Sequence, residues 1–180
     1  MWRNGENHYG RITIGLHWLV AITVIGLFTL GWWMGGLDYY DPWYREAPAL
    51  HKGTGVLLFM VMVARVVWRH TNPRPAAVGT AFEQKAAGTV HVTLYVLLFA
   101  IMLSGYLIST ADGRALKVFD LFSLPATING FENQEDLAGE IHEWLAFTVI
   151  GLTLIHALAA LKHHFLDRDA TLKRMLGTGN

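Results

Sequence analysis

The chain has 180 residues, of which 53% are hydrophobic and only 16% are charged, whereas soluble domains usually carry about 25% charged residues. This composition is typical of a membrane protein, and the formal net charge of zero gives no reason to expect a nucleic-acid partner. The absence of cysteine excludes disulfides, thiolate catalysis, cysteine-ligated iron–sulfur clusters and covalent c-type haem attachment.

The first apolar stretch follows Arg11 and covers 12–37 without an acid or a base. It is longer than the h-region of a cleaved signal peptide, about 7–15 residues, and no A-x-A site follows it. We therefore predict a retained membrane span over 12–34. The next segment, 35–49, is rich in Trp and Tyr and contains Gly-Gly, Asp-Pro and Pro48, which predict an interfacial loop.

The second predicted span, 50–68, carries three ionisable residues. It opens with His51 and Lys52, and Arg65 lies near its far end. A polar hinge over 70–84 follows, in which two prolines predict a break in the helix.

The third and fourth spans are predicted over 87–110 and 140–161. A long acidic loop, 114–139, separates them, and its apolar residues 118–124 predict a short interfacial segment. The basic residues within 162–174 predict an amphipathic tail that lies on the membrane.

Four spans place both termini on the same side of the membrane. Ten of the fourteen Lys and Arg residues then belong to the segments on that side, so the positive-inside rule predicts cytoplasmic termini in a bacterial inner membrane. We predict an all-α membrane protein, an antiparallel four-transmembrane-helix bundle formed by one domain over 1–180.

Two histidines, His142 and His156, lie fourteen residues apart in the fourth span, although 144–161 contains no Asp, Glu, Lys or Arg. On a helix this spacing places them within roughly 40° of the same face and about 21 Å apart along the axis. Each is either an ordinary buried histidine satisfied by a hydrogen bond or a metal ligand near one membrane surface. Intramembrane ionisable residues favour the functional interpretation.

The same fourteen-residue step recurs in the other three spans. It defines an inner level of residues and an outer level. The inner level consists of His17, Arg65, His91 and His156, and the outer level of Gly31, His51, Gly105 and His142. Glycines beside histidines leave room for a flat macrocycle, although small residues also let membrane helices pack closely.

Each level offers two or three histidines and no buried acid, which disfavours a structural zinc site and favours haem b with two axial imidazoles. Two imidazoles would fill both axial positions of each haem iron and leave no position for oxygen, so electron transfer is favoured over oxygen binding. At the outer level His51 and His142 are the available ligands. At the inner level His156 pairs with either His17 or His91, and Arg65 is a candidate partner for a haem propionate.

At these residues the chain resembles the bacterial cytochrome b561 family of four-helix dihaem membrane proteins, and it is close to the members described as superoxide oxidases. The resemblance covers nearly the whole chain. The segments that carry it are IGLHWLVA around His17, APALHKGTG around His51, AGTVHVTLY around His91, SGYLISTADG at 104–113, GEIHEWLA around His142 and IHALAALKHHF from 155.

The resemblance implies that His17 and His156 bind the inner haem and that His51 and His142 bind the outer haem. His91 then remains free as a candidate for the ubiquinone site. Superoxide would donate its electron at the outer level, guided by Lys52 and Arg114 together with Lys117, although ten outer carboxylates oppose the approach of an anion.

Proton supply and partners complete these expectations. His91 or the adjacent pair His163 and His164 would relay protons to the quinone. No obligatory protein partner is expected, because no extended docking arm is found beyond the 114–139 loop. The alternatives are a haem-b anchor that relays electrons between a partner redox enzyme and the quinone pool, and a haem-free carrier of protons or metal ions.

Overall fold

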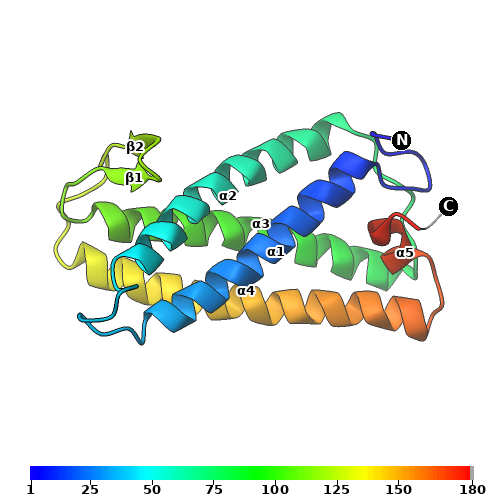
Figure 1. Ribbon diagram of the computed structural model, residues 1–180. Helices are drawn as coiled ribbons and strands as arrows, with labels where there is room; N and C mark the ends of the chain where they lie inside the picture. The colour runs from blue at the N-terminus through cyan, green and yellow to red at the C-terminus, as the bar shows by residue number, and fades with distance from the viewer. Residues whose placement is uncertain (179–180) are drawn as a thin grey trace. The chain divides into compact units, whose positions relative to one another are not determined.

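The computed structural model describes residues 1–178 and contains four long helices, a two-stranded hairpin and one short helix (Figure 1). In chain order these elements are α1 (Arg11–Met34), α2 (Glu46–Thr71), α3 (Ala81–Thr110), β1 (Leu116–Val118), β2 (Phe122–Leu124), α4 (Gln134–Phe165) and α5 (Thr171–Leu176). Each of the four long helices is long and apolar enough to cross a membrane. The predicted fold class, an all-α membrane protein with four spans, is confirmed.

Apolar side chains surround each long helix instead of forming one stripe. Ile22 in α1, Val96 in α3 and Leu154 in α4 are each at least 60% exposed. A helix that is hydrophobic all round is stable only when it is buried, and here the surrounding medium is lipid. The few buried positions therefore report contacts between helices.

The chain divides into two compact units. Unit 1 consists of Met1–Ala21, Val61–Tyr95 and Gly151–Asn180, and unit 2 consists of Ile22–Met60 and Val96–Ile150. Unit 1 thus takes the beginnings of α1 and α3 and the ends of α2 and α4, while unit 2 takes the opposite ends. Consecutive long helices therefore pass between the two units in opposite order along the chain.

The helices begin earlier than the apolar pattern predicts. The loop predicted over 35–49 is wrong at its end, because α2 starts at Glu46 and contains Pro48 in its first turn, where a proline costs no hydrogen bond. The hinge predicted over 70–84 is also too long, since α3 starts at Ala81. A capping box precedes it, in which the Thr80 N–H donates to Glu83 Oε2 and the Glu83 N–H donates to Thr80 Oγ1.

In unit 2, the segment predicted as an interfacial piece at 118–124 forms the β1–β2 hairpin, with Leu116 opposite Leu124. Its turn contains Phe119 and Asp120, both with positive φ. The ring of Phe119 lies against Gly53 of α2, where an added Cβ would lie 2.7 Å from the ring carbon Cζ. The hairpin therefore covers α2 two residues from His51.

In unit 1, the N-terminal segment is fastened to the connection between α2 and α3. The Arg3 guanidinium donates to Asn72 Oδ1 and to the Thr71 carbonyl, and Asn4 Nδ2 donates to the Pro73 carbonyl. Gly10 lies so close to this segment that a Cβ would be 2.3 Å from the Trp2 carbonyl oxygen.

The C-terminal segment of unit 1 packs against the first helix. Trp18 Nε1 of α1 donates to the Met175 carbonyl of α5, and the Arg174 guanidinium donates to the Ala76 carbonyl. The tail predicted to lie on the membrane is thus anchored by hydrogen bonds to α1 and to the connection between α2 and α3, and both ends of the described chain belong to the same unit.

The close approach at Gly10 predicts that Gly10→Ala loosens the N-terminal segment, because the methyl group meets backbone atoms that cannot yield. Tryptic cleavage after Arg3 should then become faster in detergent-solubilised protein. Gly15→Ala is the matched control, because no atom outside its own helix lies within 4 Å of the added Cβ. Equal cleavage rates for the two variants would contradict the described packing.

Candidate functional site

The outer histidine cluster lies within unit 2. His51 of α2 and His142 of α4 face each other with ring centroids 6.1 Å apart and ring planes inclined by 67°. A glycine of the neighbouring helix lies against each ring. A Cβ on Gly31 would be 3.2 Å from His51 Cε1, and a Cβ on Gly105 would be 3.2 Å from His142 Cε1. Any larger residue at these two positions would push the imidazoles away.

Hydrogen bonds fix one ring of the outer cluster and leave the other without a partner. His142 Nδ1 lies 3.0 Å from the Ile101 carbonyl and 3.0 Å from Ser104 Oγ, so Nδ1 carries the proton and Nε2 presents its lone pair. His51 Nδ1 is buried and has no hydrogen-bond partner among the described residues. A buried imidazole of this kind is typical of a site that a bound group completes.

The inner cluster lies within unit 1 and contains three histidines. The ring centroids of His17 and His156 are 6.2 Å apart, whereas those of His91 and His156 are 5.2 Å apart. The separation between His17 and His156 therefore matches that of the outer pair, and the separation between His91 and His156 does not.

Arg65 of α2 also belongs to the inner cluster. Its guanidinium donates to His17 Nδ1 over 3.0 Å and lies 5.4 Å from the ring centroid of Tyr95, on which Arg69 also stacks at 5.7 Å. In this arrangement His17 Nδ1 accepts a hydrogen bond, so Nε2 carries the proton. If His17 held a metal through Nε2, the proton would have to be at Nδ1, and Arg65 would have to release that nitrogen.

These distances test whether the residues fit haem. Two imidazoles on opposite sides of one metal, with metal–nitrogen bonds of about 2 Å, have ring centroids about 6 Å apart. The outer pair and the pair His17–His156 satisfy this geometry, and the glycines beside His51 and His142 leave space where a macrocycle edge would pass. The donor set and its surroundings therefore fit a bis-histidine haem.

The two cations predicted to guide an anion differ in their surroundings. Lys52 is exposed in the second turn of α2, next to His51. Arg114 is exposed after α3, where its guanidinium pairs with the Asp112 carboxylate. The hydrogen bond from the Arg114 side chain holds the pKa of Asp112 below its ordinary value, so the positive charge of Arg114 is largely offset.

The structure adds residues that the sequence reasoning did not assign. Ser104 precedes Gly105 and contacts the ligand candidate His142, and Tyr95 lies four residues after His91 and supports Arg65. Both lie within one turn of a residue of the fourteen-step pattern, so a search of the flanking turns for hydroxyl and aromatic side chains would have found them.

Comparisons with known proteins identify the family of the chain. The family model described as prokaryotic cytochrome b561 matches residues 8–178. The chain is 51% identical to cytochrome b561 homolog 2 of Escherichia coli (strain K12), over 97% of this chain and 94% of that protein. It is 30% identical to cytochrome b561 homolog 1 of the same organism, over 94% of this chain and 97% of that protein. It is 31% identical to the probable superoxide oxidase CybB of Yersinia pestis, over 93% of this chain and 95% of that protein.

The match begins at residue 8 and covers all four long helices and α5, so it includes every histidine of both clusters. Proteins of this kind are membrane proteins of electron transport that bind b-type haem. The chain belongs to the prokaryotic cytochrome b561 family and is a haem-binding, multi-pass membrane electron-transfer protein.

Proposed function

We propose that the protein is a dihaem b-type cytochrome that transfers electrons from superoxide at the periplasmic face to ubiquinone. The observation that carries the proposal is the presence of two histidine pairs with nearly equal ring separations, 6.1 and 6.2 Å. The probable superoxide oxidase from Yersinia pestis is a relative over almost the whole chain, which supports superoxide as the donor.

In this proposal His51 and His142 bind the outer haem, and His17 and His156 bind the inner haem. Haem b, when bound, supplies a one-electron carrier whose two axial positions are filled by imidazole. The hydrogen bond from His142 Nδ1 to the Ile101 carbonyl orients that ring and increases its basicity as a ligand. Gly31 and Gly105 keep the space beside the outer rings free, and Arg65, once released from His17, is positioned to pair with a propionate.

At the outer face Lys52 attracts the anionic donor. Its charge is next in sequence to His51, whereas Arg114 is paired with Asp112 and contributes less. Each superoxide loses one electron and leaves as dioxygen, so two superoxide anions are consumed for each quinone reduced. A single exposed cation raises the local concentration of an anion, and this effect weakens as salt is added.

At the inner face His91 serves the quinone. Its ring lies 5.2 Å from that of His156, near the inner pair but outside the ligand geometry. A ubiquinone that accepts two electrons also takes up two protons, and an imidazole beside it can hold and deliver one of them. In this proposal the protein spans the bacterial inner membrane with both termini in the cytoplasm. It acts without an obligatory protein partner.

The ligand assignment predicts distinct haem contents for three variants. His17→Gln and His51→Gln should each bind one haem per chain instead of two, because each removes one axial imidazole, and His91→Gln should retain two. Haem is measured as the pyridine haemochrome, and protein by quantitative amino-acid analysis. His70→Gln is the control, since that exposed ring bonds only the Val66 carbonyl. Loss of a haem in His91→Gln with full content in His17→Gln would reverse the inner assignment.

The proposed reaction predicts that superoxide alone reduces the purified protein and that a soluble ubiquinone analogue reoxidises it. The measurement is the b-type α-band, followed by stopped flow in detergent with potassium superoxide as donor. Reduction by dithionite but not by superoxide would favour the alternative, a haem-b anchor that waits for a partner redox enzyme.

The charge arrangement predicts that Lys52→Gln slows reduction by superoxide about threefold at low ionic strength, with the difference fading at high salt. Arg114→Gln should have a smaller effect because Asp112 already offsets its charge. Asp112→Asn should accelerate the reaction, since it leaves Arg114 unpaired. If all three variants were reduced by superoxide at the rate of the parent protein, Lys52 would have no role in attracting the donor.

A further inference from the structure

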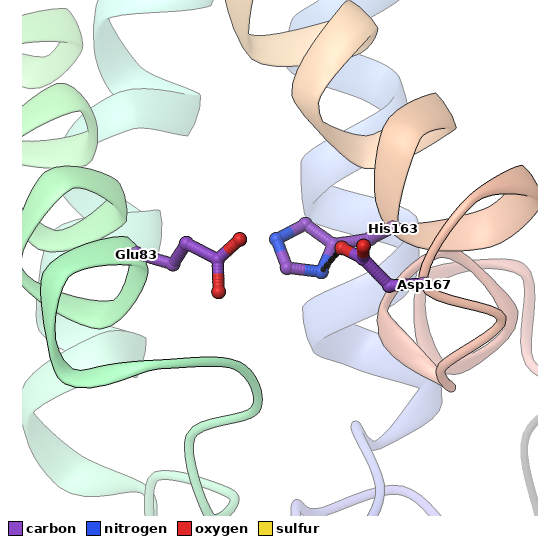
Figure 2. Close-up of side chains that lie close together, drawn as sticks. All are labelled: Glu83, His163 and Asp167. Atoms are coloured by element: carbon purple, nitrogen blue, oxygen red, sulfur yellow. Dashed lines mark ion pairs between the residues drawn. The ribbon is translucent and has the colours of Figure 1, made fainter.

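Apart from the two histidine clusters, a group of ionisable side chains lies in unit 1 where α3 begins and α4 ends. Glu83 comes from the first turn of α3, Lys162 and His163 from the last turn of α4, and Asp167 and Asp169 from the connection that follows α4. Figure 2 shows the imidazole of His163 between the carboxylates of Glu83 and Asp167. One ligand atom from each of these three residues lies within 4.8 Å of the others.

The position between the two carboxylates already holds a positive charge. Lys162 Nζ lies 2.5 Å from Glu83 Oε1 and 2.7 Å from Asp167 Oδ2. The Lys162 side chain is 44% exposed, so its ammonium can turn into solvent when another cation arrives. Two carboxylates contact this lysine and a third, that of Asp169, contacts His163, so the group has an excess of two negative charges when His163 is neutral.

The orientation of His163 suits a ligand. Its Nδ1 lies 2.6 Å from Asp169 Oδ2 and 3.1 Å from Asp167 Oδ2, and this Asp167 oxygen also contacts Lys162 Nζ. Nδ1 therefore faces the position of the ammonium, and it is the nitrogen that would bind an ion placed there after losing its proton. Burial raises the pKa of Asp169, but hydrogen bonds from Thr171 and His163 outweigh it and the pKa falls below its ordinary value.

The remaining ligand is also held in place. Glu83 Oε2 accepts hydrogen bonds from the N–H and the hydroxyl of Thr80, which leaves Oε1 directed at Lys162. Gly79, with a φ of +89°, brings the backbone against both side chains, and a Cβ there would be 2.8 Å from Glu83 Oε2 and 3.3 Å from His163 Cε1. The turn before α3 therefore fixes the carboxylate beside the imidazole.

We propose that Glu83, His163 and Asp167 form a binding site for a divalent transition-metal ion, and that Lys162 is the cation that the metal displaces. One imidazole nitrogen with carboxylate oxygens is a ligand set that suits Zn²⁺, whereas Mg²⁺ and Ca²⁺ prefer oxygen alone. The bound ion joins the start of α3 to the end of α4. The site is separate from the two histidine clusters and does not depend on the proposed electron donor or acceptor.

The test uses the full-length, haem-loaded protein in nanodiscs of zwitterionic phosphatidylcholine, treated with a chelator and titrated with ZnCl₂ in a calorimeter. One saturable site per chain is expected. Glu83→Gln and His163→Gln should each weaken binding about tenfold or more, because even residues that only support a metal ligand contribute on that scale. His164→Gln is the matched control, an adjacent histidine outside the ligand group, and should bind zinc as the parent protein does.

Lys162→Met separates a metal site from a simple ion-pair network. It removes the competing ammonium, so zinc should bind about fivefold more tightly, a change of the size expected for one nearby charge. The haem absorption spectrum verifies that each variant folds, and Asp167→Asn, which should weaken binding, replaces any variant that does not. Absence of saturable binding in the parent protein, weaker binding in Lys162→Met, or equal binding in Glu83→Gln and His164→Gln would overturn the proposal.

Discussion

The structure depends on the cost of placing a polar group in hydrocarbon, where no water can satisfy it. A partner within the protein therefore stabilises an intramembrane histidine or arginine, and the described contacts supply several such partners. His142 has the Ile101 carbonyl, and His17 has Arg65, which in turn stacks on Tyr95. These pairings hold segments of different helices at a defined depth and rotation, and the histidine clusters are the result.

Much of the fold was predictable because the membrane reduces it to lengths of apolar sequence. The positions of the four long helices followed from stretches without Asp, Glu, Lys or Arg, and the fourteen-residue step predicted which histidines would share a cluster. Helix starts were missed where short-range chemistry decides them, as at Pro48 in a first turn or the capping box before Glu83. The β1–β2 hairpin was missed because three-residue strands leave little periodicity to detect.

The candidate site was predictable in its members but not in their pairing. Sequence spacing treats His17 and His91 alike, since both lie six residues from an inner base, and only the packing of α1 and α3 around His156 separates them by ring distance. The sequence also did not reveal that the charge of Arg114 is offset by a neighbouring carboxylate. The pairing of Arg114 with Asp112 depends on a turn that brings residues two positions apart into contact, and a count of charges cannot reveal it.

The contact between Arg65 and His17 bears on how the protein matures. Insertion of a cofactor at the inner cluster has to break a charged hydrogen bond, worth about 1.5–3 kcal/mol, and to change the tautomer of His17. The outer cluster presents no such barrier, because His51 has a free nitrogen and His142 already has the tautomer that a ligand needs. Under the proposed assignment of one haem to each cluster, the outer cluster would fill first, and a chain short of haem would accumulate in a half-loaded form in which Arg65 still bonds to His17.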